Sequence, residues 1–285
     1  MYIDYHVHTH YSDDSLYPME ECVKDAINLG IQELAITDHV DYGIKNDWDE
    51  DKEIIYRGHE PLANVDYLRW EKEIGYLKEK YKGQVSIKMG MEFGMQVHTI
   101  PKYQKLFKKY PFDFIILSIH QVEDKEFWTQ DFQRGKTQRE IYERYYQEML
   151  NLVKLYKNYS VLGHMDLIVR YDQNGTYPFE KIKPIITKIL KQVINDGKGI
   201  EVNTSYHRYG LSDMTPSRDI LKLYQELGGT VITIGSDSHK KEHLGAYIEE
   251  AKIELKKLGF QYYCTFDQMK PIYHELEEKK DEELY

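Results

Sequence analysis

The sequence predicts an α/β fold, a closed barrel of parallel strands with a metal site at their carboxyl ends. Short apolar segments alternate with helical segments seven times, which is typical of a parallel sheet with helices outside it. The segment 112–119 is almost continuously apolar, as in a strand buried on both faces. Polar residues of metal-binding types follow the strands. A closed barrel gathers all strand ends at one face, whereas an open doubly wound sheet gathers only those near its switch point.

The chain has 285 residues, which suits one domain that buries its core without disulfides. We expect a single domain over 1–285, with a charged tail at 271–285. The two cysteines fit a reducing compartment, and neither a signal peptide nor a membrane-spanning run is visible, so a cytoplasmic protein without a membrane partner is expected. The net charge of -10 argues against nucleic acid as a partner. The sequence does not specify the oligomeric state.

The first strand leads directly to the first candidate ligands. Apolar and aromatic residues run up to His6, and His8 lies two residues further on. Residues two apart on a strand point to the same side, so both imidazoles can reach one metal ion. Asp13 and Asp14 follow on the loop and offer oxygen ligands. Taken alone, this pattern is equally compatible with two ordinary strand histidines.

The remaining strands and helices follow from apolar spacing and from start and stop signals. Pro18 suits the first turn of a helix and Gly30 the position after its end, and Thr137 with Glu140 forms a capping box. The expected strands are 2–8, 33–37, 85–91, 112–119, 161–162, 199–202 and 230–234. The expected helices are 18–29, 61–81, 101–110, 137–156, 179–195, 215–228 and 245–258.

Three segments lack a regular period. Residues 40–60 and 121–136 are expected to be long loops, which in α/β proteins often shape a functional site. The segment after Lys270 is too charged for a core, so we expect it to be helical or frayed.

Nine candidate ligands stand at the strand ends, and six of them are histidines out of 12 in the chain. They are His6, His8, Asp13, His39, Glu92, His120, His164, Asp237 and His239. One zinc ion takes about four ligands, so this set suits two or three divalent ions with open positions for water and substrate. Imidazole and carboxylate accept zinc, iron or manganese. Clustered ions stabilise the attacking and leaving oxygens of a phosphoryl displacement, and Glu92 could bridge two of them.

Two arginines, Arg170 and Arg208, follow strand ends on loops that should face the metals. The planar guanidinium group matches phosphate oxygens, so both are candidates for binding a phosphorylated substrate. Surface salt bridges are the alternative role for each.

The same residues carry a family resemblance. The segments HVHTHYSDD, TDH, GMEFG, SIH, GHMD and GSDSH resemble, in order, the motifs of the polymerase and histidinol phosphatase (PHP) superfamily. The resemblance runs from Tyr2 to His239 and implies a distorted (β/α)7 TIM-like barrel. It implies three ion sites: His6, His8, Glu92 and Asp237 at the first; Glu92, His120 and His164 at the second; Asp13, His39 and His239 at the third. The family pattern places the carboxylate directly after Ser12, which favours Asp13 over the alternative, Asp14.

The segments GHMDLIVR, ending at Arg170, and EVNTSYHR, ending at Arg208, resemble the stand-alone histidinol-phosphate phosphatases of this superfamily. That resemblance implies hydrolysis of L-histidinol phosphate to L-histidinol and phosphate in histidine biosynthesis. Both arginines would then bind the phosphate and act in catalysis, together with Glu92, His120 and Asp237.

Tyr206 and His207 depart from the pattern of those phosphatases, which has a small residue followed by Leu. The departure leaves the substrate open. Another phosphate monoester, a nucleotide or single-stranded DNA is the alternative. A deacetylase-like amidohydrolase would not account for the arginines, and a binding protein that has lost catalysis would be expected to lack a ligand.

Overall fold

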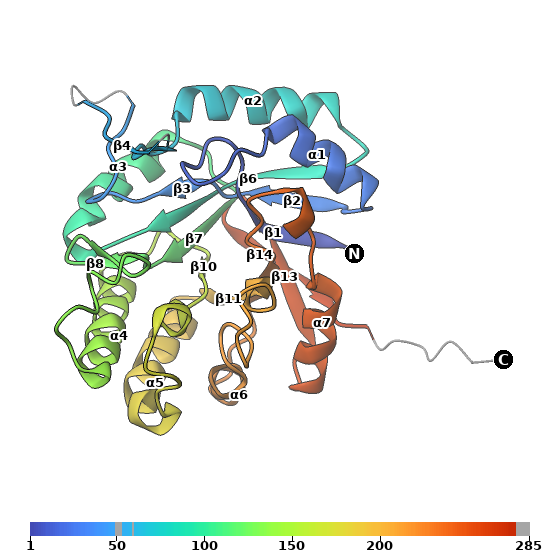
Figure 1. The fold of residues 1–285 in the computed structure, drawn as a ribbon. Helices are drawn as coiled ribbons and strands as arrows, with labels where there is room; N and C mark the ends of the chain where they lie inside the picture. Colours follow the sequence, from blue (N-terminus) through green and yellow to red (C-terminus); the bar gives the residue numbers. More distant parts are fainter. Residues whose placement is uncertain (49–52, 59, 278–285) are drawn as a thin grey trace.

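The computed structural model describes residues 1–48, 53–58 and 60–277. Seven parallel strands pair in the order β1-β2-β6-β7-β10-β11-β12, and the helices lie around the outside of the strands (Figure 1). The strands are β1 (Ile3–Val7), β2 (Glu33–Ile36), β6 (Ser86–Gly94), β7 (Phe114–Ser118), β10 (Val161–Leu162), β11 (Gly199–Asn203) and β12 (Ile232–Gly235). The predicted seven-stranded parallel α/β barrel is therefore confirmed.

The barrel is nearly closed, because the end of β1 meets the residues that follow β12. The His8 backbone N–H donates to the Ser238 carbonyl at 2.7 Å, and the Ser238 N–H donates to the His6 carbonyl at 3.2 Å. The fully buried Asp4 carboxylate strengthens this junction by accepting from the backbone N–H groups of Ser236 (2.9 Å) and Gly245 (2.8 Å). Closure brings the carboxyl ends of all seven strands to one face, as an open sheet would not.

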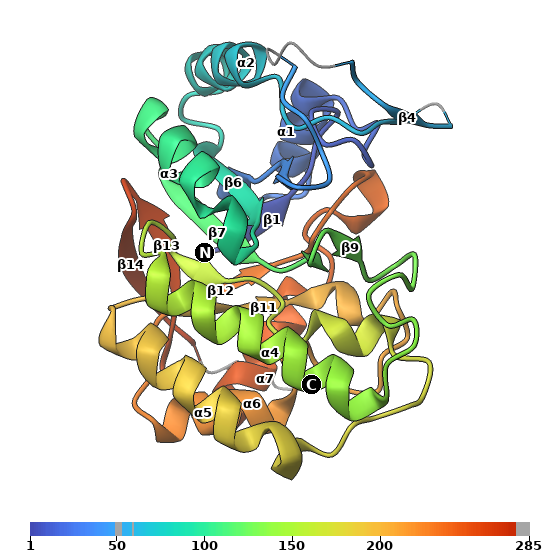
Figure 2. The same ribbon diagram turned by 90° about the vertical axis from the view of Figure 1, so that its left-hand side faces the viewer.

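All seven expected helices are present. They are α1 (Met19–Asn28), α2 (Tyr67–Lys80), α3 (Ile100–Lys109), α4 (Gln138–Leu155), α5 (Phe179–Asn195), α6 (Arg218–Glu226) and α7 (Ile248–Lys257). Helix α4 has the expected capping box between Thr137 and Glu140. Helix α2 begins six residues later than expected, after Asp66, whose side chain accepts from the Arg69 N–H. Figure 2 shows α4, α5 and α6 side by side along one flank of the barrel. No helix among the described residues is long and apolar enough to cross a membrane.

The segments expected to be loops contain short paired strands. Strand β3 (His39–Val40) pairs with β6, while β4 (Tyr56–Arg57) pairs with β5 (Glu60–Pro61) and β8 (Gln121–Val122) with β9 (Lys125–Glu126). Each of these strands has two residues, which is too short to produce an alternating pattern in the sequence.

The expectation of a helical or frayed tail after Lys270 is wrong. Strands β13 (Tyr262–Asp267) and β14 (Lys270–Glu275) form an antiparallel hairpin, so the charged tail does not begin at 271; residues 278–285 lie outside the described residues. Phe266 and Cys264 are buried, and the Phe266 N–H donates to the Tyr5 hydroxyl at 2.8 Å. The Met269 N–H donates to the carbonyl of Asp113, just before β7. The hairpin thus packs at the amino ends of the strands, opposite the predicted site.

Candidate metal centre

The carboxylate of Glu92, fully buried on β6, lies among five imidazoles. Its Oε2 atom is 3.1 Å from His39 Nδ1, 3.2 Å from His6 Nε2 and 3.5 Å from His8 Nε2. Its Oε1 atom is 3.1 Å from His120 Nε2 and 2.9 Å from His164 Nε2. Two ligand atoms of a tetrahedral zinc ion lie about 3.4 Å apart, because each is about 2.1 Å from the metal. The spacing therefore matches that of metal ligands, and the two oxygens face two different groups of imidazoles.

Asp237 follows β12 and completes the first of these groups. Its Oδ1 atom is 3.5 Å from His8 Nε2 and 3.8 Å from His6 Nε2. Ligand atoms of His6, His8 and Asp237 all lie within 4.8 Å of one another. The structure thus brings together the four residues that the family resemblance assigns to one ion, and Glu92 joins them to the pair of His120 and His164.

The third group contains Asp14 in place of Asp13. Asp14 Oδ2 lies 3.1 Å from His239 Nε2 and 3.5 Å from His39 Nε2. Asp13 Oδ1 instead accepts from the buried Lys45 ammonium at 2.5 Å. The two neighbouring carboxylates lie on a turn and have different partners, so the contacts of His39 and His239 differ from those expected.

Buried carboxylates orient two of the imidazoles through the ring nitrogen that faces away from Glu92. His6 Nδ1 hydrogen-bonds Glu201 at 2.5 Å, and His120 Nδ1 hydrogen-bonds Asp41 at 2.7 Å. Such partners fix the tautomer and leave the other ring nitrogen free to face a metal. Sequence reasoning missed both carboxylates. The signal for Glu201 is an acidic residue between the apolar residues Ile200 and Val202 of strand β11, and Asp41 stands two residues after His39 without a pattern of its own.

The cluster fits divalent metal ions. Among the described residues, five of its buried polar atoms have no hydrogen-bond partner: His6 Nε2, His8 Nε2, His39 Nδ1, His164 Nδ1 and Glu92 Oε2. Leaving such atoms unsatisfied costs about 1–3 kcal/mol each, so a ligand is expected there. Burial opposes a positive charge on His6, but Glu201, Glu92 and Asp237 outweigh it and hold the pKa of His6 well above its usual value. These carboxylates therefore favour a cation beside His6, and imidazole with carboxylate suits zinc, iron or manganese.

A cavity of about 420 Å³ opens over the cluster, and both predicted arginines line it. Arg170 donates to the Ser205 hydroxyl at 2.7 Å. Arg208 donates to the carbonyls of Ser236 (2.7 Å) and Asp237 (2.6 Å). Each guanidinium group lies 3.6–3.7 Å from Asp237 Oδ2. Both arginines thus lie beside the candidate ligands, in positions from which they can reach a bound phosphate.

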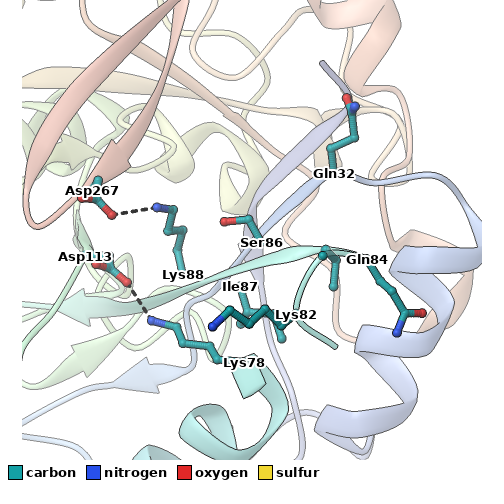
Figure 3. A pocket seen from close by; sticks show the side chains of 11 residues that line it. Gln32, Lys78, Lys82, Gln84, Ser86, Ile87, Lys88, Asp113 and Asp267 are labelled. Atoms are coloured by element: carbon teal, nitrogen blue, oxygen red, sulfur yellow. Dashed lines mark hydrogen bonds and ion pairs between the residues drawn. The ribbon is translucent and has the colours of Figure 1, made fainter. Parts of the chain in front are cut away.

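A second cavity, of about 540 Å³, lies at the opposite end of the barrel, between α2 and the start of β6 (Figure 3). Its lysines already have partners: Lys78 contacts Asp113 at 3.1 Å and Lys88 contacts Asp267 at 2.8 Å. Active sites of parallel barrels lie at the carboxyl ends of the strands. We therefore assign the functional site to the cavity over the imidazoles.

Fold and site together define a metal-binding α/β-barrel enzyme, with its imidazoles and carboxylates gathered at the carboxyl ends of the strands. The chain belongs to the PHP domain family, whose model matches residues 4–205. The family resemblance seen in the motifs is thereby confirmed.

Similar proteins share most of the chain. It is 30% identical to the histidinol-phosphatase of Lactococcus lactis over 275 residues, which is 94% of this chain and 95% of that protein. It is 29% identical to a probable histidinol-phosphatase of Clostridium acetobutylicum, covering 88% of this chain and 91% of that protein. The crystal structure of the Lactococcus lactis histidinol phosphate phosphatase with zinc, L-histidinol and phosphate matches with a TM-score of 0.82 at 28% identity, covering 95% and 98% of the two chains.

Proposed function

We propose that this protein is a metal-dependent phosphatase that hydrolyses L-histidinol phosphate to L-histidinol and phosphate, a step of histidine biosynthesis. The observation that carries the proposal is one cavity in which two arginines, Arg170 and Arg208, lie beside a cluster of imidazoles and carboxylates. The Lactococcus lactis relative with the same fold was solved with zinc, L-histidinol and phosphate, and it supports this choice of substrate.

Two or three divalent ions would be held by the clustered side chains. The proposed groups are His6, His8, Glu92 and Asp237; Glu92, His120 and His164; and Asp14, His39 and His239. Asp14 replaces Asp13 because it contacts both histidines of the third group, whereas Asp13 is paired with Lys45. Zinc, iron or manganese would supply Lewis acidity, which lowers the pKa of water and neutralises phosphate charge.

The arginines would bind and orient the phosphate. Arg208 is fixed by two backbone carbonyls, so its guanidinium group is held in place before a substrate arrives. One N–H group of Arg170 donates to the Ser205 hydroxyl, and its buried Nε has no hydrogen-bond partner among the described residues. A phosphate accepting from both would have its charge stabilised as the ester bond breaks.

The cavity lining also contains groups that can recognise the organic part of the substrate. Glu126 and Trp128 line it, and Arg57 joins them by an ion pair with Glu126 (2.8 Å) and by a stack on the Trp128 ring (4.4 Å). The carboxylate suits the ammonium group of histidinol phosphate, and the indole face suits its imidazole. We propose Glu126 as the amine-binding residue, with the substrate ammonium group replacing Arg57 as the partner of its carboxylate.

A substrate panel tests the proposal. Metal-loaded protein is given L-histidinol phosphate, phosphate esters that lack the imidazole or the amine, and single-stranded DNA, and phosphate or nucleotide release is measured. We expect the highest kcat/KM for L-histidinol phosphate. Equal rates on all monoesters, or cleavage of DNA alone, would argue for a different member of the family. The net charge of -10 argues against DNA as the substrate.

A further inference from the structure

Tyr209 has an unusual position for a tyrosine whose side chain is half exposed. Its exposed fraction is 49%, yet its ring lies 3.9 Å from the Arg170 guanidinium carbon and 5.2 Å from that of Arg208. It also lines the cavity above the metal cluster. The ring therefore lies against both arginines that the proposed function assigns to the phosphate.

Arg170 needs such a restraint. Its guanidinium group donates to the Ser205 hydroxyl at 2.7 Å, interacts with the Tyr171 side chain and lies 3.7 Å from Asp237 Oδ2. Without the ring, the guanidinium group could rotate onto the Asp237 carboxylate, where its donors would no longer reach a phosphate. A guanidinium group that stacks on a ring keeps its edge donors available, because the ring occupies only its face.

The loop that carries Tyr209 is itself fixed by aromatic stacking. His207 stacks on Tyr247 with ring centroids 3.8 Å apart and an interplanar angle of 16°, and Tyr206 lies 4.1 Å from His207 on the other side. The Thr204 hydroxyl donates to the Ala246 carbonyl at 2.6 Å. These contacts join the loop after β11 to the loop after β12. The residues at 206 and 207 thus hold the backbone from which Tyr209 extends.

We propose that Tyr209 is a positioning residue for phosphate recognition: its ring holds the guanidinium groups of Arg170 and Arg208 toward the cavity. The inference rests on the proposed function in taking phosphate as the group that the arginines bind. It assigns to this loop a role in the affinity for phosphate, separate from the metal centre.

The test compares Tyr209→Leu, which removes the ring and keeps apolar bulk, with Tyr209→Phe, which keeps the ring. Tyr76→Leu is the matched control, since Tyr76 is 56% exposed on α2 and has Lys80 over its ring at 5.2 Å, far from the site. Inorganic phosphate is titrated into each metal-loaded protein by calorimetry, and KM and kcat for L-histidinol phosphate are measured on the same samples. Metal content and melting temperature are recorded for each variant.

We expect Tyr209→Leu to weaken phosphate binding and to raise KM by about three- to thirtyfold, with a smaller change in kcat. Tyr209→Phe should stay within about twofold of the parent, as should Tyr76→Leu, with metal content unchanged in all three. Phosphate affinity and KM unchanged in Tyr209→Leu would overturn the inference, and so would an equal loss in Tyr209→Phe. If the parent protein binds phosphate but does not hydrolyse L-histidinol phosphate, the proposed function fails, while the phosphate titrations still decide the role of Tyr209.

Discussion

Asp14 and Asp13 are neighbours in the sequence, and replacing each by alanine should have different consequences. Asp14 lies 3.1 Å from His239 and 3.5 Å from His39, so Asp14→Ala removes one of the three side chains proposed for the third ion. Losing a partner that only supports a ligand costs about 10–100-fold in metal affinity, and losing a ligand should cost at least as much. We expect dialysed Asp14→Ala to contain about one ion fewer per chain, with reduced kcat.

Asp13→Ala should instead affect stability. Asp13 is paired with the buried Lys45, which retains Asp41 at 2.8 Å after the substitution. Losing one hydrogen bond between charged groups costs about 1.5–3 kcal/mol. For a chain of this size that corresponds to a melting temperature lower by about 3–6 °C. Metal content should be unchanged.

The assay for this pair is elemental analysis and calorimetric melting on the same preparations of the two variants and the parent. Loss of an ion in Asp13→Ala with full metal content in Asp14→Ala would refute the reasoning and restore Asp13 as the ligand. Loss of an ion in neither variant would remove both carboxylates from the metal centre.

Three further predictions follow from the site. Glu201→Gln should lower metal affinity by roughly 10–100-fold, since it weakens the hydrogen bond that orients His6; competition with a chelator measures this, and an unchanged affinity contradicts it. His120→Ala and His164→Ala should each lower kcat by roughly a hundredfold or more with the fold intact, and near-parental kcat in added metal would exclude that residue as a ligand. Arg208→Ala should lower kcat/KM roughly ten- to a hundredfold, with only partial recovery in Arg208→Lys; unchanged kcat/KM would rule out the phosphate role.

Much of the fold could be predicted because the signals are local. Each strand of the barrel has its own apolar run, and parallel strands of a closed barrel must end at the same face, so His6, Glu92 and His164 could be placed together without coordinates. The hairpin of β13 and β14 could not be predicted from the sequence. Its stability comes from packing Phe266 and Cys264 against the barrel rather than from its own charged sequence.

The details of the site depend on contacts between distant segments. Asp13 and Asp14 are neighbouring residues of the same type. Only the conformation of the turn that contains them decides which carboxylate contacts His39 and His239. Glu201 is identified by its 2.5 Å contact with His6, which is 195 residues away in the chain. Tyr209 offers no motif at all, and its position over the arginines comes from the loop that its neighbours fix by stacking.

In the proposed function, clustered divalent ions and two arginines release phosphate from L-histidinol phosphate. The most direct measurement is phosphate release by chelator-stripped protein during titration with zinc or manganese, with bound metal determined at each point. The proposal predicts no turnover without metal and activity that saturates at about two or three ions per chain. Turnover by metal-free protein, or no phosphate release from L-histidinol phosphate by fully loaded protein, would contradict it.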